Sequence, residues 1–333
     1  MILGVDLGGH SFALGFVREG SVLSLREYPT PRSRSHEAVS SALKGKIEEM
    51  ASGIKVHGIG IGVPGMLDRE RETILRSPNF PGWEGLPLRS LLEKALGIPV
   101  QMENDANCTA LGEGALGSAQ GLKDYVVLTL GTGVGGGIVG GGRLVRGAQG
   151  MAGELGHIVT GGNLPCGCGG TGHLETLAGA DGIEAKAAAL GLEPDLKRLW
   201  EQRESSGAGE VWQAALEALG RSVASLVHTL DPEAVILGGG LGPAEGFIAA
   251  LEPIVRRYLG EPYRFCLDLR PASLGKAAAA HPLVQADLRQ LQRPPGRPRA
   301  DPAGAPGGHC SSGGTVPSLL WAPEAPHLSW AHR

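Results

Sequence analysis

Short apolar runs closed by glycine alternate with amphipathic segments along most of this chain. Residues 2–6 predict a buried strand that ends in the turn Gly8-Gly9, because a compact apolar run bounded by glycine is typical of strands. Similar signals predict the other elements of a first half: strands over 12–17, 22–28, 59–63 and 98–103, and helices over 36–51, 86–96 and 104–116. The last helix begins at an Asn cap. A strand meander followed by alternating helices and strands is typical of an α/β unit.

A similar order of elements begins again at residue 125. Residues 125–130 predict a strand that ends in Gly131-Thr132-Gly133, and short strands follow at 138–139 and 144–145. The opening VDLGG of the first half resembles LTLGT at the start of the second, and each is followed by the same order of strand, turn and strand. Further along, the pattern predicts helices over 211–230, 247–259 and 277–291 and a strand over 234–237. The sequence therefore predicts an α/β fold of two related halves with a cleft between them.

Domain boundaries follow from this duplication. We place an N-terminal lobe at residues 1–116, completed by the helix predicted over 277–291, and a C-terminal lobe at 117–276 that carries a loop over 157–173. The segment 292–333 differs in composition, since twelve of the twenty-five residues between Arg293 and Pro317 are Pro or Gly. Such a segment cannot bury enough apolar surface to offset its ordering entropy, so we expect a disordered tail.

Composition excludes several classes of protein. Hydrophobic residues make up 42% and charged residues 19% of the 333 positions, which is ordinary for a globular protein of about two domains. The net charge of -4 argues against a general nucleic-acid binder. Five cysteines do not form the pattern of a secreted disulfide framework, and neither a leader segment nor a membrane-spanning apolar run is present. We therefore expect a cytoplasmic protein without membrane or nucleic-acid partners.

Four candidate metal ligands lie within 17 residues: His157, Cys166, Cys168 and His173. Two thiolates and two imidazoles suit four-coordinate zinc. The Cys-x-Cys spacing is tighter than the usual Cys-x-x-Cys, so reduced thiols beside two loop histidines stay open as an alternative. The many glycines nearby favour the metal, because wrapping a backbone around an ion needs unusual dihedrals. Since Glu154 and Glu175 flank the ligands, a metal here would organise a loop that also presents carboxylates to a ligand.

Glycine-rich turns are the candidate phosphate sites. Residues 131–136 satisfy Gly-x-Gly-x-x-Gly, but six glycines over 135–142 argue against the helix that a Rossmann site requires next. No Gly-x-x-x-x-Gly-Lys-Ser/Thr is present either. Two strand–turn–strand loops remain, Gly8-Gly9 and 131–133, whose amides can form anion-binding nests, although glycines that only permit hairpins are the alternative. Asp6, just before the first loop, is a candidate for holding the Mg²⁺ that accompanies ATP.

The chain resembles the ROK family of sugar kinases and sugar-responsive repressors over about residues 1–291. The motifs that carry the resemblance are Asp6-Leu7-Gly8-Gly9, Glu103-Asn104-Asp105-Ala106-Asn107, Leu130-Gly131-Thr132-Gly133-Val134-Gly135-Gly136, Gly153-Glu154-Leu155-Gly156-His157, Cys166-Gly167-Cys168-Gly169 and Leu174-Glu175. The segment 77–84 is most similar to the bacterial glucokinases of that family. The resemblance implies an actin/hexokinase-like (ribonuclease H-like) fold with two lobes closing over ATP and a sugar.

The resemblance also implies roles for individual residues, with Asp105 as the catalytic base. Sugar binding is implied for Gly65, Asn79, Asn104, Asp105, Glu154, His157 and Glu175. Nucleotide binding is implied for Asp6, Gly8, Gly9, Ser11, Gly131, Thr132, Gly133, Gly239 and Gly240. The family's usual Gly-Gly-Thr-Lys is Gly-Gly-His-Ser here, which makes the Ser11 hydroxyl the candidate replacement for the lost threonine. His173 stands where a third cysteine is usual, and it can still bind zinc.

We expect an ATP-dependent kinase that phosphorylates the 6-hydroxyl of glucose, with Mg²⁺ bound to ATP, a structural Zn²⁺ and a homodimeric or homotetrameric assembly. Kinases of N-acetylglucosamine or N-acetylmannosamine, a polyphosphate donor, and a non-catalytic zinc-containing sugar sensor are the alternatives. The family's repressors carry a helix-turn-helix domain before the first strand, which is predicted to begin at Ile2 here. Asp105 has a structural alternative as a helix cap, a role that Asn104 can also fill.

Overall fold

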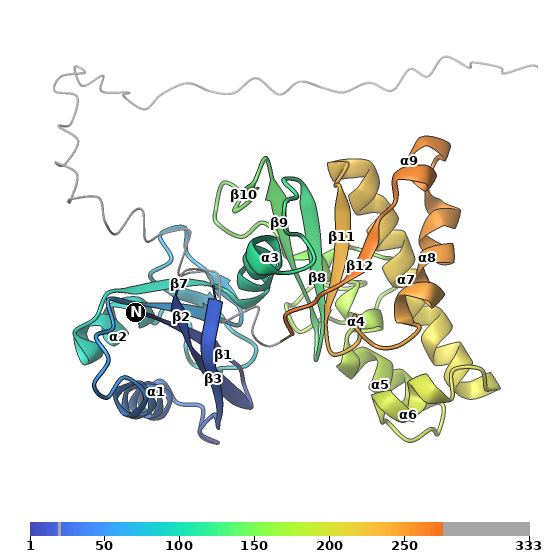
Figure 1. The fold of residues 1–333 in the computed structure, drawn as a ribbon. Coiled ribbons are helices and arrows are strands. Elements are labelled where there is room, and N and C mark those ends of the chain that lie inside the picture. Colours follow the sequence, from blue (N-terminus) through green and yellow to red (C-terminus); the bar gives the residue numbers. More distant parts are fainter. Residues whose placement is uncertain (19–20, 276–333) are drawn as a thin grey trace, which may run out of the picture. The chain divides into compact units, whose positions relative to one another are not determined.

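The computed structural model describes residues 1–18 and 21–275 (Figure 1). The helix predicted over 277–291 and the tail predicted over 292–333 lie outside the described residues. The lobe boundaries at 116, 117 and 276 therefore stay predictions.

The first sheet has five strands in the order β3-β2-β1-β4-β7. Their bounds are Ile2–Leu7 (β1), Ser11–Arg18 (β2), Ser21–Pro29 (β3), Gly58–Val63 (β4) and Val100–Asn104 (β7). β1, β2 and β3 form the predicted antiparallel meander, and β4 and β7 continue the sheet in parallel with β1. All six residues of β4 are buried, as expected for a central parallel strand covered on both faces. The helices α1 (His36–Met50) and α2 (Leu88–Leu96) contribute apolar side chains to the core of this half.

The second sheet repeats this arrangement strand for strand, in the order β10-β9-β8-β11-β12. Its strands are β8 (Tyr125–Leu130), β9 (Val134–Gly140), β10 (Arg143–Leu144), β11 (Ala234–Gly239) and β12 (Leu269–Pro271). β8, β9 and β10 are antiparallel, whereas β11 and β12 run parallel to β8. β9 follows the glycine turn at 131–133 directly, so the predicted hairpin is confirmed at the point where a Rossmann fold would have a helix. The predicted duplication is confirmed as well.

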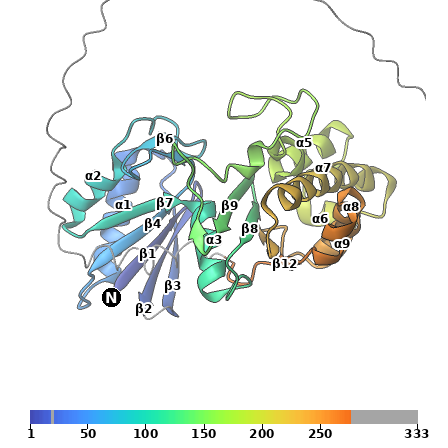
Figure 2. The same ribbon diagram turned by 90° about the horizontal axis from the view of Figure 1, so that it is seen from above.

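Helices of the second half cover its sheet (Figures 1 and 2). They are α4 (Glu175–Ala178), α5 (Ala180–Ala189), α6 (Leu196–Glu201), α7 (Ser206–Leu230), α8 (Phe247–Tyr258) and α9 (Glu261–Cys266). Trp200, Trp212 and Phe247 form an aromatic cluster in which the ring centroids of Trp200 and Trp212 are 4.9 Å apart. No helix among residues 1–18 and 21–275 combines the length and the apolar character that a bilayer span needs. Periodicity did not predict the short elements α4, α5, α6, α9 and β12, nor the hairpin of β5 (Met66–Leu67) and β6 (Ile74–Arg76), because each is too short or too mixed in polarity.

The helix α3 (Asp105–Leu116) packs on strands of both sheets. It follows β7 of the first sheet and lies against β8 and β9 of the second (Figure 1). Glycines permit this close approach, since a Cβ on Gly137 would come within 2.6 Å of the Ala110 methyl group. Tyr125 donates a hydrogen bond of 3.0 Å from its hydroxyl to the Ala110 carbonyl oxygen. The first turn of α3 is therefore held at the junction between the two halves.

Candidate active site

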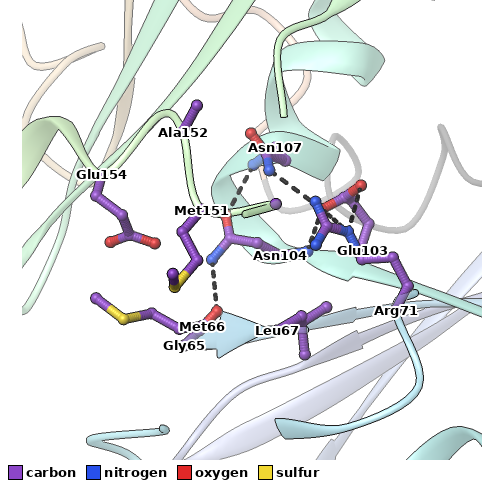
Figure 3. Close-up of a pocket in the computed structure, with 11 residues that line it drawn as sticks. Gly65, Met66, Leu67, Arg71, Glu103, Asn104, Asn107, Met151, Ala152 and Glu154 are labelled. Atoms are coloured by element: carbon purple, nitrogen blue, oxygen red, sulfur yellow. Dashed lines mark hydrogen bonds and ion pairs between the residues drawn. The ribbon is translucent and has the colours of Figure 1, made fainter. Parts of the chain in front are cut away.

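Asn104 and Asp105 occupy the turn between β7 and α3, and the structure separates their roles. Asn104 is the N-cap of α3, because its Oδ1 accepts a hydrogen bond of 3.0 Å from the Asn107 amide. Its Nδ2 donates to the Gly65 carbonyl oxygen at 3.1 Å (Figure 3). Asp105 is the first helical residue, and its Oδ1 accepts a hydrogen bond of 2.8 Å from the neighbouring Ala106 amide. The cap is thus supplied by Asn104, and the Asp105 carboxylate is available for other chemistry.

Burial dominates the electrostatics of Asp105. Loss of hydration raises the pKa of Asp105 from 3.8 to about 6, although hydrogen bonds from the backbone and from Asn104 oppose the shift. Burial also raises the pKa of Glu154, and the charges of Asp105 and Glu175 raise it further. The three carboxylates therefore share one partly desolvated environment, although they are far apart in the sequence.

A polar pocket opens beside this turn (Figure 3). It is lined by Gly65, Met66, Leu67, Arg71, Glu103, Asn104, Asn107, Gly150, Met151, Ala152 and Glu154. The lining comes from the β5–β6 hairpin and the glycine before it, from the end of β7, from α3 and from the loop that precedes the 3₁₀ turn Leu155–His157. Three residues predicted to bind sugar, Gly65, Asn104 and Glu154, are thus brought together from both halves. Near them, the ring Nε2 of His157 lies 3.8 Å from the Glu154 carboxylate.

The base of this pocket holds a buried carboxylate that sequence reasoning did not assign a role. Glu103 is fully buried and accepts from Nε of Arg71 at 3.1 Å and from Nε of Arg146 at 2.8 Å. It also accepts from the Asn107 side chain at 3.1 Å and from the Asn104 amide at 3.0 Å. Two guanidinium groups offset the desolvation of the buried charge. Glu103 belongs to a quoted motif, but Arg71 and Arg146 carry no sequence signal because they meet it only in the folded chain.

The four predicted metal ligands, His157, Cys166, Cys168 and His173, form one cluster. Their ligand atoms all lie within 4.8 Å of one another. Sγ of Cys166 is 3.7 Å from Nδ1 of His157, and Sγ of Cys168 is 3.2 Å from Nδ1 of His173. Tetrahedral zinc with bonds of about 2.0–2.3 Å separates neighbouring ligand atoms by roughly 3.3–3.8 Å, so the geometry and the donor set fit this ion. The predicted spatial cluster is confirmed.

A tight glycine-rich turn makes this cluster possible. The Gly169 amide donates to the Cys166 carbonyl oxygen at 2.9 Å, and the Cys166 amide donates to the Gly170 carbonyl oxygen at 2.9 Å. Gly169 has a φ of 96°, which favours glycine. A Cβ on Gly170 would lie 2.5 Å from the His173 ring. The glycines between the ligands therefore serve the geometry of the cluster.

The predicted phosphate loops follow strand ends. In the first sheet, Gly8-Gly9 follows β1, and the Gly8 amide donates to the Ser11 carbonyl oxygen at 2.9 Å. In the second sheet, residues 131–133 follow β8, and the adjacent parallel strand β11 ends at Gly239, directly before Gly240. Ligands of open α/β sheets bind at the carboxyl ends of parallel strands. The glycine loops, Gly65 and Asp105 all occupy such ends.

Several other residues predicted to bind sugar or nucleotide make close contacts within the chain. A Cβ on Gly9 would lie 3.1 Å from the Asn79 side chain, and a Cβ on Gly133 would lie 2.1 Å from the Glu175 carboxylate. Glu175 also accepts from the Val134 amide at 3.2 Å. The Ser11 hydroxyl donates to the Glu27 carboxylate at 2.5 Å, so it faces β3 here. The role predicted for Ser11 in nucleotide binding stays a prediction.

Asp6 lies within electrostatic reach of the same region as Asp105. Burial raises the pKa of Cys108 well above its ordinary value, and the charges of Glu103, Asp105 and Asp6 raise it further, in that order. The carboxylates of Glu103, Asp105 and Asp6 are therefore all near enough to Cys108 to disfavour its thiolate.

Comparison with known proteins identifies the family. The family model described as ROK matches residues 2–282. This chain belongs to the ROK family. A glucokinase from Thermotoga maritima is 38% identical over 262 residues, which span 73% of this chain and 83% of the relative. The predicted class, a sugar kinase of the ROK family, is confirmed by these matches.

Solved structures of the ROK family share the fold. A ROK hexokinase from Thermus thermophilus has 38% sequence identity and a TM-score of 0.75, covering 87% of this chain and 98% of that protein. A ROK glucokinase from Streptomyces griseus, solved with glucose and AMPPNP, has 34% identity and a TM-score of 0.74, with coverages of 87% and 99%. The predicted actin/hexokinase-like fold of two lobes is confirmed.

Proposed function

We propose that this ROK protein transfers the γ-phosphoryl group of ATP to the 6-hydroxyl of glucose, with Asp105 as the general base. The observation that carries the proposal is the environment of Asp105. Its carboxylate stands at the carboxyl end of β7, beside the pocket residue Asn104, and is not needed as the helix cap. It is also buried enough for its pKa to reach about 6.

A protein catalyses phosphoryl transfer mainly by positioning the two substrates and by stabilising the charge on the transferred group. In the proposed reaction, Asp105 accepts the proton of the sugar 6-hydroxyl as that oxygen attacks the γ-phosphorus of ATP and ADP leaves. A base whose pKa is near 6 is ionised at neutral pH and still basic enough to accept this proton. Burial supplies that pKa here.

Acceptors on the second half complete the proposed sugar site. Glu154 lines the pocket, His157 lies 3.8 Å from it, and Glu175 raises its pKa. Sites built to hydrogen-bond sugar hydroxyls discriminate strongly, because an unmet buried acceptor is destabilising. The structure of the similar Streptomyces griseus glucokinase was solved with glucose and AMPPNP, which supports glucose as acceptor and ATP as donor.

The nucleotide and metals complete the proposal. We assign the phosphates of ATP to the loops at 8–9 and 131–133, the adenosine to Gly239-Gly240, and the accompanying Mg²⁺ to Asp6. Cys166, Cys168, His157 and His173 would hold Zn²⁺, whose chemical contribution would be to stabilise the loop rather than to take part in the transfer. Assembly as a homodimer or homotetramer stays a prediction that sedimentation velocity can test.

A substrate and donor panel tests the proposed function. The purified protein is assayed with glucose, N-acetylglucosamine, N-acetylmannosamine and fructose, each with ATP or polyphosphate, and the sugar phosphate is quantified by mass spectrometry. We expect glucose with ATP to give the highest kcat/KM, at least about tenfold above the other pairs. A preference for an N-acetylated hexosamine or for polyphosphate would replace the acceptor or donor proposed above. Calorimetric sugar binding without transfer from either donor would identify a sugar sensor instead.

A further inference from the structure

One arginine joins the candidate metal centre to the pocket wall. Arg76, the last residue of β6, donates from Nη1 to the Cys168 carbonyl oxygen at 2.8 Å and from Nη2 to the Gly167 carbonyl oxygen at 2.7 Å. These acceptors lie 92 and 91 residues later in the chain. Two hydrogen bonds from one planar guanidinium fix both the position and the orientation of the partner segment. Arg76 thus holds the turn that carries the metal ligand Cys168.

The main chain of Arg76 packs against two residues that line the pocket, Gly65 and Met66. In the β5–β6 hairpin Arg76 pairs with Met66, which lines the pocket. Its carbonyl oxygen lies so close to Gly65 that a Cβ there would be 2.2 Å away. Gly65 in turn accepts the hydrogen bond from Asn104. A single residue therefore supports the pocket wall with its backbone and reaches the turn of the metal cluster with its side chain.

The carbonyl groups that Arg76 binds are those that the metal turn leaves open. The Cys166 carbonyl oxygen accepts from the Gly169 amide, and the Gly170 carbonyl oxygen accepts from the Cys166 amide. Within the part of the chain that the structure describes, the carbonyl oxygens of Gly167 and Cys168 accept hydrogen bonds from Arg76 alone. A backbone carbonyl oxygen is more stable when it accepts a hydrogen bond. A hydrogen bond donated by a cation such as a guanidinium group is stronger than one donated by a neutral group.

We propose that Arg76 is a positioning residue that couples metal retention to sugar binding. Sugar that occupies the pocket holds the β5–β6 hairpin in place, and Arg76 passes this restraint to the turn at Gly167-Cys168. In the other direction, a bound metal fixes that turn and thereby the pocket wall beside Gly65. The inference deepens the proposed function of the same site and rests on it for the identity of the sugar.

The test compares Arg76→Met, Arg76→Lys and a matched control, Arg257→Met. Arg257 lies on α8, where its exposed guanidinium pairs with Glu217 and lines no part of the pocket. Three quantities are measured on each zinc-loaded protein: the KM for glucose, the KM for ATP, and the rate at which a coloured chelator withdraws zinc, with and without saturating glucose. Thermal melting verifies that each variant is folded.

For Arg76→Met we expect a glucose KM and a zinc-release rate each about tenfold above wild type, with the ATP KM within about twofold. Glucose should slow zinc release from the wild type and from Arg257→Met but not from Arg76→Met. Arg76→Lys should have a glucose KM and a zinc-release rate between those of the wild type and Arg76→Met. Its ammonium group keeps the charge but cannot donate to both carbonyl groups as the planar guanidinium does. A wild-type glucose KM together with wild-type zinc release in Arg76→Met would overturn the inference.

The two proposals fail in different ways. If the wild type phosphorylates no sugar, the kinase proposal fails, while faster zinc release from Arg76→Met still supports the link between Arg76 and the metal turn. If the wild type phosphorylates glucose but Arg76→Met has the same glucose KM and the same zinc-release rate, only the proposed coupling through Arg76 fails. Wild-type protein that binds no zinc during purification in zinc-containing buffer also overturns the link.

Discussion

The carboxylate of Glu103 lies 2.8 Å from Nε of Arg146, although 43 residues separate them in the chain. Glu103 lies near the end of β7 in the first sheet, beside Asn104 and Asp105. Arg146 belongs to the loop that leads to Glu154. This ion pair, together with the contact from Arg71, connects the segment of the candidate base to the loop that carries Glu154, a proposed sugar ligand. Glu103 itself lines the pocket, together with Asn104 and Glu154.

Substitution of Glu103 should destabilise the whole protein. Glu103→Gln leaves Arg71, which is itself buried, without its compensating charge, and we expect the free energy of unfolding to fall by about 3 kcal/mol. Urea unfolding followed by circular dichroism measures the change. Glu72→Gln is the control, since Glu72 forms a longer and more exposed pair with Arg89 and should change stability by less than about 1 kcal/mol. Equal effects of both substitutions would show that the buried network contributes no special stability.

Replacement of the proposed base should separate activity from stability. We expect Asp105→Asn to lower kcat by about 10²–10⁴-fold, because the amide cannot accept the proton. Its Oδ1 can still accept the Ala106 amide, so the head of α3 should be preserved. Sugar binding measured by calorimetry should persist. Near-normal turnover by this variant would remove Asp105 from the mechanism.

The same variant should be more stable than the wild type at neutral pH. The pKa of Asp105 in the folded protein, about 6, exceeds its ordinary value of 3.8, so the stability associated with the protonated group is present below pH 3.8 and is lost as pH rises through 6. A difference of about two pKa units corresponds to about 3 kcal/mol. Asp105→Asn should therefore melt at a higher temperature than wild type at pH 7.5, and the two should converge near pH 4. A pH-independent difference would contradict the assigned pKa.

The pH dependence of catalysis should report the same group. Because a base acts only when ionised, kcat/KM for glucose should rise with pH and level off above an apparent pKa of about 6. Initial rates between pH 5 and 8, with ATP and Mg²⁺ saturating, measure the profile. A midpoint near 4 would mean that Asp105 is more hydrated in the enzyme before glucose binds than its burial implies.

Loss of a metal ligand should affect stability and sugar affinity together. Cys166→Ser removes one thiolate of the cluster, whereas Cys266→Ser changes an exposed free cysteine on α9 and serves as the control. We expect Cys166→Ser to lose bound zinc, to melt at a lower temperature and to show a glucose KM raised by about tenfold, since the loop no longer has a fixed conformation. Elemental analysis, melting curves and kinetics test the three effects. Full activity in zinc-free protein would show that the loop needs no metal.

The elements that dominate each half were predictable because local patterns specify them. Buried apolar runs such as β4 and the amphipathic face of α7 carry their own periodicity, and the glycines over 135–142 exclude a helix locally. Asn104 as the cap of α3 also follows from local chemistry. The four candidate metal ligands were recognisable because all of them lie within one short segment.

The network around Glu103 and the contact of Arg76 with the metal turn depended on tertiary structure. Arg71, Arg76 and Arg146 look like ordinary surface arginines in the sequence, since nothing local distinguishes them. They acquire partners only when two sheets, each stable through its own core, bring together residues 32 to 92 positions apart. The sequence by itself thus determined which chemical groups the protein carries and how each half folds. The tertiary structure decided which of those groups meet, because hydrogen bonds and ion pairs act over a few ångströms in space regardless of separation along the chain.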